Sequence, residues 1–396
     1  EVFQALTTGS DNIAMGSGAV DAITTGTTNV GIGSYSLSGT TTAASNTAVG
    51  YKSLYTNTTG AANVAVGNCS LHSNTTAAGN VSIGVNSSKA NTEGANNVAI
   101  GKDAFEANTT GDENVAIGFT ALDANTTADG NTAVGTAALG ANTTGHSNTS
   151  VGKASLLTNT TGESSVAIGY SALNKNTTAG NNVAVGWKAL EANTVGFENT
   201  GLGNQAGDEI TTGDQNTAAG SNALGKVTTG DGNTGLGRAA GDLTTTGGNN
   251  ISIGLNSDPT ANDVSNQITL GNGDNDNLRC ADTSISTLSD ERDKENIENI
   301  PHGLDYILAI RPVKFDWKTR DGSREGKKDY GFIAQELAKV EEKFESAEYT
   351  RLVHKENPEK WEADVMKTYP ILIKAVQELS ETNKKLLSRI EELEKK

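Results

Sequence analysis

A glycine recurs every 17 residues through the first two thirds of the chain, without one insertion or deletion. The residue four positions before it is Asn in fourteen of the sixteen units, and Ser165 and Gln267 are the exceptions. A fixed period of this length is typical of chains that wind into stacked coils, so the repeat predicts a solenoid over residues 1–271. The glycines stand at positions 16, 33, 50, 67, 84, 101, 118, 135, 152, 169, 186, 203, 220, 237, 254 and 271.

Each unit combines a short strand pattern with turn residues. Two Val, Ile or Thr residues flank a small residue just before the glycine, as in Val64 and Val66. This alternation predicts a strand with both branched side chains on one face. The Ala-Leu pair that follows, as in Ala121-Leu122, is expected to give a second inward contact, and the Asn-Thr-Thr-Gly run predicts a turn. Fifteen steps of about 4.8 Å give a rod about 70 Å long.

A coil of 17 residues encloses few aliphatic side chains, so a single rod leaves an apolar face exposed along its length. Three chains packed together would cover that face, and we therefore expect a homotrimer. The chain begins without Met and inside a repeat. We expect it to be the distal part of a longer protein.

Charge divides the chain into two parts. Residues 289–396 hold 21 Lys and Arg against 24 Asp and Glu, a net charge of −3, which leaves −14 of the total of −17 for residues 1–288. A sparsely charged, acidic array argues against nucleic acid, which requires clustered cations. A cell surface, presenting glycan or protein, is the more natural partner.

Membrane insertion, metals and cofactors are not expected. The chain has no run of about 20 apolar residues. Cys69 and Cys280 lie far apart without metal-ligand spacing, so we expect free thiols rather than a disulfide framework or a zinc site. The Asn-Thr-Thr triplets match glycosylation sequons, but we interpret them as turns.

The repeat resembles a known family. Its Asn-x-Ala-Ile-Gly core is similar to the head repeat of trimeric autotransporter adhesins and to repeats in phage and algal-virus fibres. The resemblance covers most of residues 10–271. It implies a trimeric left-handed β-roll or an interwoven triple β-helix, and the repeat does not choose between the two.

The period ends at Gly271, and residues 272–288 are expected to form a linker. A helix is predicted to start within residues 301–310, a strand is predicted at 311–317, and residues 330–337 are expected to be apolar and partly buried. Residues 368–396 carry a coiled-coil pattern. Its leucines recur every seven residues at Leu372, Leu379, Leu386 and Leu393, with Tyr369, Val376, Asn383 and Ile390 at the partner positions. Residues 289–396 are thus expected to be a small α+β domain ending in a coiled coil.

Four ordered motifs give this segment a second resemblance. They are Ser289-Asp290-x-Arg292-x-Lys294, Arg311-Pro312-Val313-x-Phe315, Gly331-Phe332-Ile333-Ala334-Gln335-Glu336 and the run from Leu372 to Leu379. Together they are similar to the intramolecular chaperone domain at the C-terminus of phage tail spikes and fibres, over nearly all of residues 289–396. The resemblance implies a trimerising domain that guides folding of the β-structured stalk and then cuts itself off at the Leu288–Ser289 bond.

Ser289 and Lys294 have the chemistry for such a cut. A lysine amine serves as a base when burial or nearby cations lower its pKa, and Lys294 is within reach of Ser289 if the chain turns between them. Asp290 and Arg292 are expected to hold that turn through a salt bridge or backbone hydrogen bonds. The predicted activity is a single self-cleavage, with no other substrate turned over.

We therefore expect a viral tail fibre or spike component that attaches to the host surface, joins upstream virion tail proteins and assembles in the host cytoplasm. Two alternatives stay open, namely a purely structural shaft and a spike that depolymerises glycans. Tyr51, Phe119, Tyr170 and Trp187 all follow a repeat glycine. Aromatic rings stack on sugars, and these four are candidate receptor-binding residues.

Overall fold

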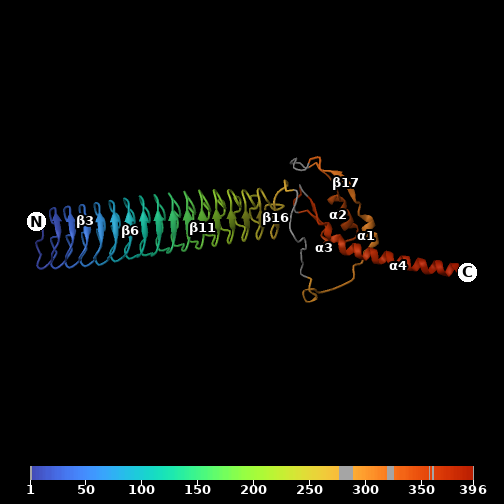
Figure 1. The fold of residues 1–396 in the computed structure, drawn as a ribbon, viewed down its shortest axis with the longest axis horizontal. Coiled ribbons are helices and arrows are strands. Elements are labelled where there is room, and N and C mark those ends of the chain that lie inside the picture. Colours follow the sequence, from blue (N-terminus) through green and yellow to red (C-terminus); the bar gives the residue numbers. More distant parts are fainter. Residues whose placement is uncertain (1, 276–288, 319–324, 356, 359–360, 396) are drawn as a thin grey trace. The chain divides into compact units, whose positions relative to one another are not determined.

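The computed structural model of the chain describes residues 2–275, 289–318, 325–355, 357–358 and 361–395. The chain divides into two compact units, Glu1–Asn272 and Gly273–Lys396. The first is a parallel β-solenoid and the second is a small α+β unit with a long C-terminal helix (Figure 1). The mainly β fold class predicted from the repeat is confirmed.

The solenoid contains one three-residue strand per coil, and all sixteen strands lie in one sheet in chain order. Each strand pairs in parallel with the strand 17 residues later, as in Val115 with Thr132. The strands are β1 (Ile13–Met15), β2 (Val30–Ile32), β3 (Thr47–Val49), β4 (Val64–Val66), β5 (Val81–Ile83), β6 (Val98–Ile100), β7 (Val115–Ile117), β8 (Thr132–Val134), β9 (Thr149–Val151), β10 (Val166–Ile168), β11 (Val183–Val185), β12 (Thr200–Leu202), β13 (Thr217–Ala219), β14 (Thr234–Leu236), β15 (Ile251–Ile253) and β16 (Ile268–Leu270).

Because every strand pairs with its neighbours from the same chain, the arrangement is the stacked roll rather than the interwoven helix. In an interwoven triple helix, strands of other chains would lie between successive coils. Figure 1 shows the strands following one another along the array, from blue at the N-terminus to yellow.

The strand alternation is present, but its branched side chains face outward. In β7 the central Ala116 is fully buried, while Val115 and Ile117 are partly exposed. Most strand centres hold Ala or Ser, and at Gly31 even a Cβ would lie 2.4 Å from Cγ2 of Val20. The interior is filled instead by the Ala-Leu pairs, so the contact expected to be secondary is the main one.

The repeat glycine is required by the backbone at the end of each strand. From Gly16 to Gly254 its φ lies between +120° and +143°, a region that L side chains rarely adopt. A Cβ at Gly118 would also lie 2.5 Å from the carbonyl oxygen of Gly135 in the next coil. The backbone conformation and the lack of space for a Cβ therefore both require glycine at this position.

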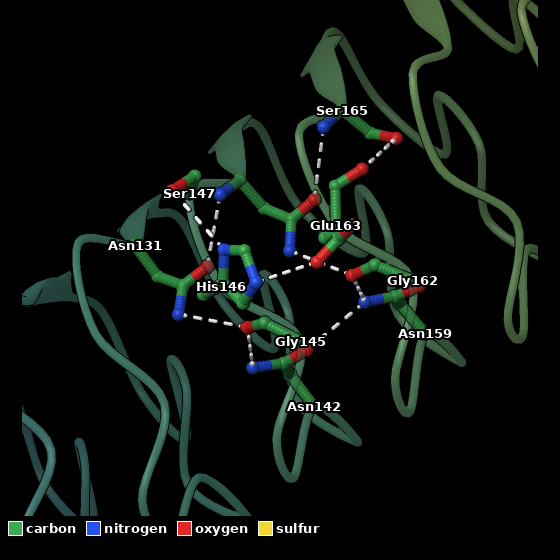
Figure 2. A network of polar contacts seen from close by, with 10 residues as sticks. Asn131, Asn142, Gly145, His146, Ser147, Asn159, Gly162, Glu163 and Ser165 are labelled. Carbon is green, nitrogen blue, oxygen red and sulfur yellow. Dashed lines mark hydrogen bonds and ion pairs between the residues drawn. The ribbon is translucent and has the colours of Figure 1, made fainter.

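Two ladders of buried Asn side chains join the coils. In the first, Asn131 Oδ1 accepts from the backbone N–H of Asn148 (2.9 Å) and its Nδ2 donates to the carbonyl of Gly145 (3.0 Å). In the second, Asn159 Nδ2 donates to Oδ1 of Asn142 (2.9 Å) and to the carbonyl of Gly162 (2.9 Å). Figure 2 shows both ladders around these residues. Side-chain amides thus satisfy backbone groups that the short strands leave unpaired.

The second unit contains short elements around a small core. They are η1 (Glu291–Asp293), α1 (Leu304–Ala309), β17 (Val313–Asp316), β18 (Lys328–Gly331), α2 (Ala334–Lys343), α3 (Ala347–Thr350), β19 (Val353–His354), β20 (Glu362–Ala363), η2 (Val365–Thr368) and α4 (Tyr369–Glu394). β17 pairs with β18 and β19 with β20, both antiparallel. Tyr306, Val340, Leu352 and Ile371 form the buried core.

The helix and the strand expected within residues 301–317 are present as α1 and β17. The apolar run 330–337 is divided between the end of β18 and the start of α2. Its members differ in burial, because Leu337 is buried whereas Tyr330 is 83% exposed. α4 covers the predicted coiled-coil segment as a single helix. Its heptad leucines are between 44% and 56% exposed.

Candidate functional site

The residues from Ser289 to Lys294 form one tight turn. Asp290 caps the short helix η1, and its Oδ1 accepts from the backbone N–H of Arg292 (2.9 Å). The backbone N–H groups of Asp293 and Lys294 donate to the carbonyls of Asp290 (3.2 Å) and Glu291 (3.1 Å). The chain therefore reverses over four residues and brings both ends of the motif together.

This turn places Lys294 against Ser289. The Nζ atom of Lys294 lies 2.7 Å from Ser289 Oγ and 3.3 Å from the Ser289 carbonyl oxygen. A hydroxyl and an amine at this distance can exchange a proton directly. A neutral amine here would accept the hydroxyl proton, whereas the charged ammonium can only donate.

Asp290 and Arg292 lock the turn in the way expected for them. The guanidinium Nε donates to Oδ1 of Asp290 (3.0 Å) and Nη2 donates to Oδ2 (2.6 Å), a bidentate pair. This side-chain hydrogen bond, followed by the backbone one, holds the pKa of Asp290 below its ordinary value. The same pair raises the pKa of Arg292. Asp290 therefore stays ionised, and the turn keeps its geometry, down to a lower pH than for a free aspartate.

The Ser-Lys pair is exposed to solvent. Ser289 and Lys294 are both exposed, and Asp290 is half-buried. Leu288, the other half of the expected cleavage bond, lies outside the described residues. The single chain thus supplies contact and orientation between Ser289 and Lys294, and it supplies no burial for the base.

Two further charged contacts tie the motifs together. Arg311 makes a bidentate pair with Glu336 at the start of α2, and this hydrogen bond lowers the pKa of Glu336. Glu378 of α4 accepts from the backbone N–H of Leu304 (2.8 Å) and so caps α1. The sequence predicts no role for Glu336 or Glu378. The available signal was their charge within otherwise apolar motifs.

Residues 289–347 match a family model described as chaperone of endosialidase. The match begins at Ser289 and includes the turn, the Arg311 motif and the Glu336 motif. Together with the β-solenoid it supports a tail-spike-like protein with a C-terminal chaperone domain. Searches of curated proteins and of solved structures give no match.

The chaperone match covers less than the resemblance noted from the sequence. It ends at residue 347, so the run from Leu372 to Leu379 lies beyond it. That run is nevertheless joined to the matched segment, because Glu378 caps α1. That residues 289–396 form one chaperone domain stays a prediction.

The four candidate receptor residues lie on the surface of the solenoid. Tyr51, Phe119, Tyr170 and Trp187 are between 44% and 50% exposed. Only Tyr170 and Trp187 lie in consecutive coils. Their receptor role stays a prediction.

Other candidate sites lose support or gain none. Every Asn of the Asn-Thr-Thr triplets belongs to the second ladder and is fully buried, so these sequons are inaccessible in the folded array. Cys69 is a free thiol, and Cys280 lies outside the described residues. Among the residues that the structure describes, no group of three His, Cys, Asp or Glu side chains could hold a metal ion. No helix in the described ranges is both long and apolar enough to cross a membrane.

Proposed function

We propose that this chain is a viral tail fibre or spike component whose array attaches to the host surface. In this proposal, residues 289–396 assemble three chains, start the folding of the array, and then detach by cutting the Leu288–Ser289 bond. The observation that carries the proposal is the 2.7 Å contact between Lys294 and Ser289, at the first residue of the chaperone match.

The array has a physical need for a folding aid. Each coil holds up to three non-glycine residues with positive φ, as at Ser45, Lys52 and Leu54. Each such residue costs about 1 kcal/mol or more in backbone strain. A typical coil buries one large aliphatic side chain, such as Leu54, so it gains stability mainly by stacking on a coil already formed. A folding aid that supplies the first coil would therefore remove the slowest step in the folding of the array.

Two unpartnered apolar surfaces support a trimer. The outward strand residues form a continuous face, with Met15, Leu236 and Leu270 more than half exposed. The α4 leucines at Leu372, Leu379, Leu386 and Leu393 are between 44% and 56% exposed. A heptad stripe of this kind is buried when helices of other chains pack against it.

The proposed cut uses the hydroxyl that directly follows the bond. Lys294, as a neutral amine, removes the proton of Ser289 Oγ, and Oγ attacks the carbonyl carbon of Leu288. The C–N bond then breaks, and the Ser289 nitrogen takes the proton from Lys294 to become a free amine. The Leu288 acyl group is now an ester on Oγ. Water hydrolyses this ester to a Leu288 carboxylate and restores the hydroxyl.

Assembly would be the trigger. The Ser-Lys turn is exposed in one chain, and a lysine becomes an effective base when it is desolvated or placed near other cations. Packing of three chaperone segments would provide both the desolvation and the nearby cations. Cleavage would then follow trimerisation, and removal of the aid would leave the fibre kinetically trapped.

The chaperone role is tested by producing residues 1–288 with and without residues 289–396. We expect the full chain to give soluble trimers by sedimentation and the shortened chain to aggregate. Residues 1–288 that form the same trimer unaided would contradict a chaperone role. The attachment role is tested separately, by binding of labelled trimer to host cells.

A further inference from the structure

One stretch of the acidic array contains no acidic residue. Residues 22–92 have neither Asp nor Glu and include Lys52, His72 and Lys89, although residues 1–288 carry a net charge of −14. This stretch spans four successive coils, so it forms a continuous length of the rod with local positive charge. Its charge pattern is opposite to that of the rest of the array.

The same coils gather aromatic rings on the surface. Tyr35 packs edge-on against Tyr51 (centroids 6.5 Å apart) and Tyr55 (6.4 Å), and Tyr55 stacks on His72 (5.2 Å). Tyr35 and Tyr51 are 41% and 46% exposed. Within the described residues of the array, these three pairs are the contacts between aromatic rings. With Lys52, the four rings form what we call the tyrosine platform.

Lys52 lies over the platform. Its Nζ is 5.5 Å from the Tyr51 ring centre and 5.0 Å from that of Tyr55. Within the described residues no carboxylate forms a salt bridge with it. Lys188 occupies the same repeat position beside Trp187 (5.0 Å), but its charge is neutralised by Glu191 at 3.0 Å. The two sites thus share a ring and a lysine and differ in net charge.

The pKa of His72 responds to the same local positive charge. Burial, followed by the charges of Lys52 and Lys89, lowers the pKa of His72. Lys89 itself is 3.6 Å from Glu106, which leaves Lys52 as the cation best placed to meet a ligand.

We propose that the tyrosine platform (Tyr35, Tyr51, Lys52, Tyr55 and His72) binds an acidic sugar chain. The Tyr rings offer rigid apolar faces for the C–H face of a sugar ring, and their hydroxyls offer hydrogen bonds. Lys52 pairs with the carboxylate or sulfate of the sugar. No acidic side chain within residues 22–92 repels that group, and the nearest carboxylate, Asp21 beside Tyr35, accepts a hydrogen bond from Ser38 (2.9 Å). This inference rests on the proposed attachment role of the array and names its ligand class.

The test is affinity electrophoresis of the full-length protein in gels containing polygalacturonate, dextran sulfate or neutral dextran. Because the protein is itself strongly acidic, nonspecific attraction to a polyanion is not expected. We expect one or both acidic polymers to retard the wild type and neutral dextran not to. Retardation by only one polymer identifies the acidic group as carboxylate or sulfate.

Three variants make the result specific. Lys52→Glu should weaken binding at least tenfold, and the double change Tyr51→Ala and Tyr55→Ala should do the same with Lys52 still present. Lys188→Glu is the matched control and should bind like the wild type. Sedimentation of each variant checks that it still assembles.

Equal retardation by dextran, no retardation by either acidic polymer, or full binding by Lys52→Glu would each overturn the inference. Cell binding separates it from the attachment role. Protein that binds the polymers but not host cells contradicts attachment and leaves the platform standing. Cell binding unchanged by Lys52→Glu contradicts the platform alone.

Discussion

The first Asn ladder is interrupted once inside the array, at Ser165. Its hydroxyl accepts from the backbone N–H of Asn182 at 3.3 Å, whereas Asn148 Oδ1 meets the N–H of Ser165 at 3.0 Å. Serine also has no amide to donate to the Ala179 carbonyl. Next to this gap, His146 Nε2 lies 2.5 Å from Oε2 of Glu163 in the neighbouring coil (Figure 2). The Ser165 hydroxyl instead donates to the Glu163 carbonyl at 3.3 Å, so both side-chain hydrogen bonds at this position are longer than those of the neighbouring Asn residues.

Ser165→Asn is predicted to stabilise the array. The new amide would donate to Ala179, a gain of about 1 kcal/mol for the added hydrogen bond, and its oxygen would replace the long contact of the hydroxyl with Asn182. The thermal midpoint should rise relative to the wild type. Thr161→Asn, at an exposed turn position without a positive φ, is the control and should leave the midpoint unchanged. A lower midpoint for Ser165→Asn would show that the site has no room for the amide.

The coil of β5 divides the solenoid core into two apolar clusters. One cluster runs from Ala19 to Leu71 and the other from Ala99 to Val227. Between them, Ser82, Ser87 and Ser88 occupy positions that hold Ala, Ala and Leu in the coil of β8. Ser82 Oγ donates to the Ser87 carbonyl (2.9 Å). A hydroxyl network therefore replaces apolar packing in this coil.

Hydrogen exchange should locate this weak coil. Losing one buried Leu removes about 1.5–3 kcal/mol, which corresponds to roughly tenfold or more in an opening equilibrium. Amides in residues 81–89 are predicted to exchange at least about tenfold faster than those in residues 132–140. The comparison is internal, because both peptides come from one digest. Equal protection of the amides in the two coils would contradict the division of the core into two clusters.

The outward strand face gives a direct test of trimer packing. Changing Val115 and Ile117 to Lys would bury like charges between chains, at several kcal/mol per ion. We predict that this variant sediments as monomer or aggregate. Lys at Thr110 and Thr127, two exposed turn positions, should leave the trimer intact. A normal trimer with charged strands would place the interface on another face.

The period of the repeat was enough to predict strands, turns and stacked coils, because spacing alone determines which residues align. The direction in which Val115 and Ile117 point could not be predicted this way. Alternation indicates that two side chains share a face, and only the width of the coil determines whether that face is inside. The positive φ at Leu54 and its equivalents also left no signal, since leucine is not typical of that conformation.

The Ser-Lys contact was within reach of sequence reasoning because both residues belong to one short motif. Its geometry depends on the Asp290 cap and the Arg292 pair, which that motif contains. The Glu378 cap on α1 could not be predicted, because it joins residues 74 positions apart. Burial of Lys294 is likewise not readable from one chain, since in our account other chains provide it.

At the scale of the whole molecule, the chain joins two parts. Folding of the solenoid is difficult to initiate, and the C-terminal segment is suited to initiating it. The array contains the apolar strand face and the tyrosine platform, and residues 289–396 contain the heptad helix and the Ser-Lys turn. In our account the second part is needed only until the first is assembled. The central claim is therefore that assembly leads to loss of the chaperone segment.

Intact mass and N-terminal sequencing of the purified protein test this claim most directly. The wild type should yield a fragment that begins at Ser289, together with a trimer of the remaining chain. Ser289→Ala and Lys294→Ala should stay whole and still sediment as trimers, which separates loss of chemistry from loss of folding. A wild-type trimer that stays whole would contradict the account and make residues 289–396 a permanent trimerisation cap.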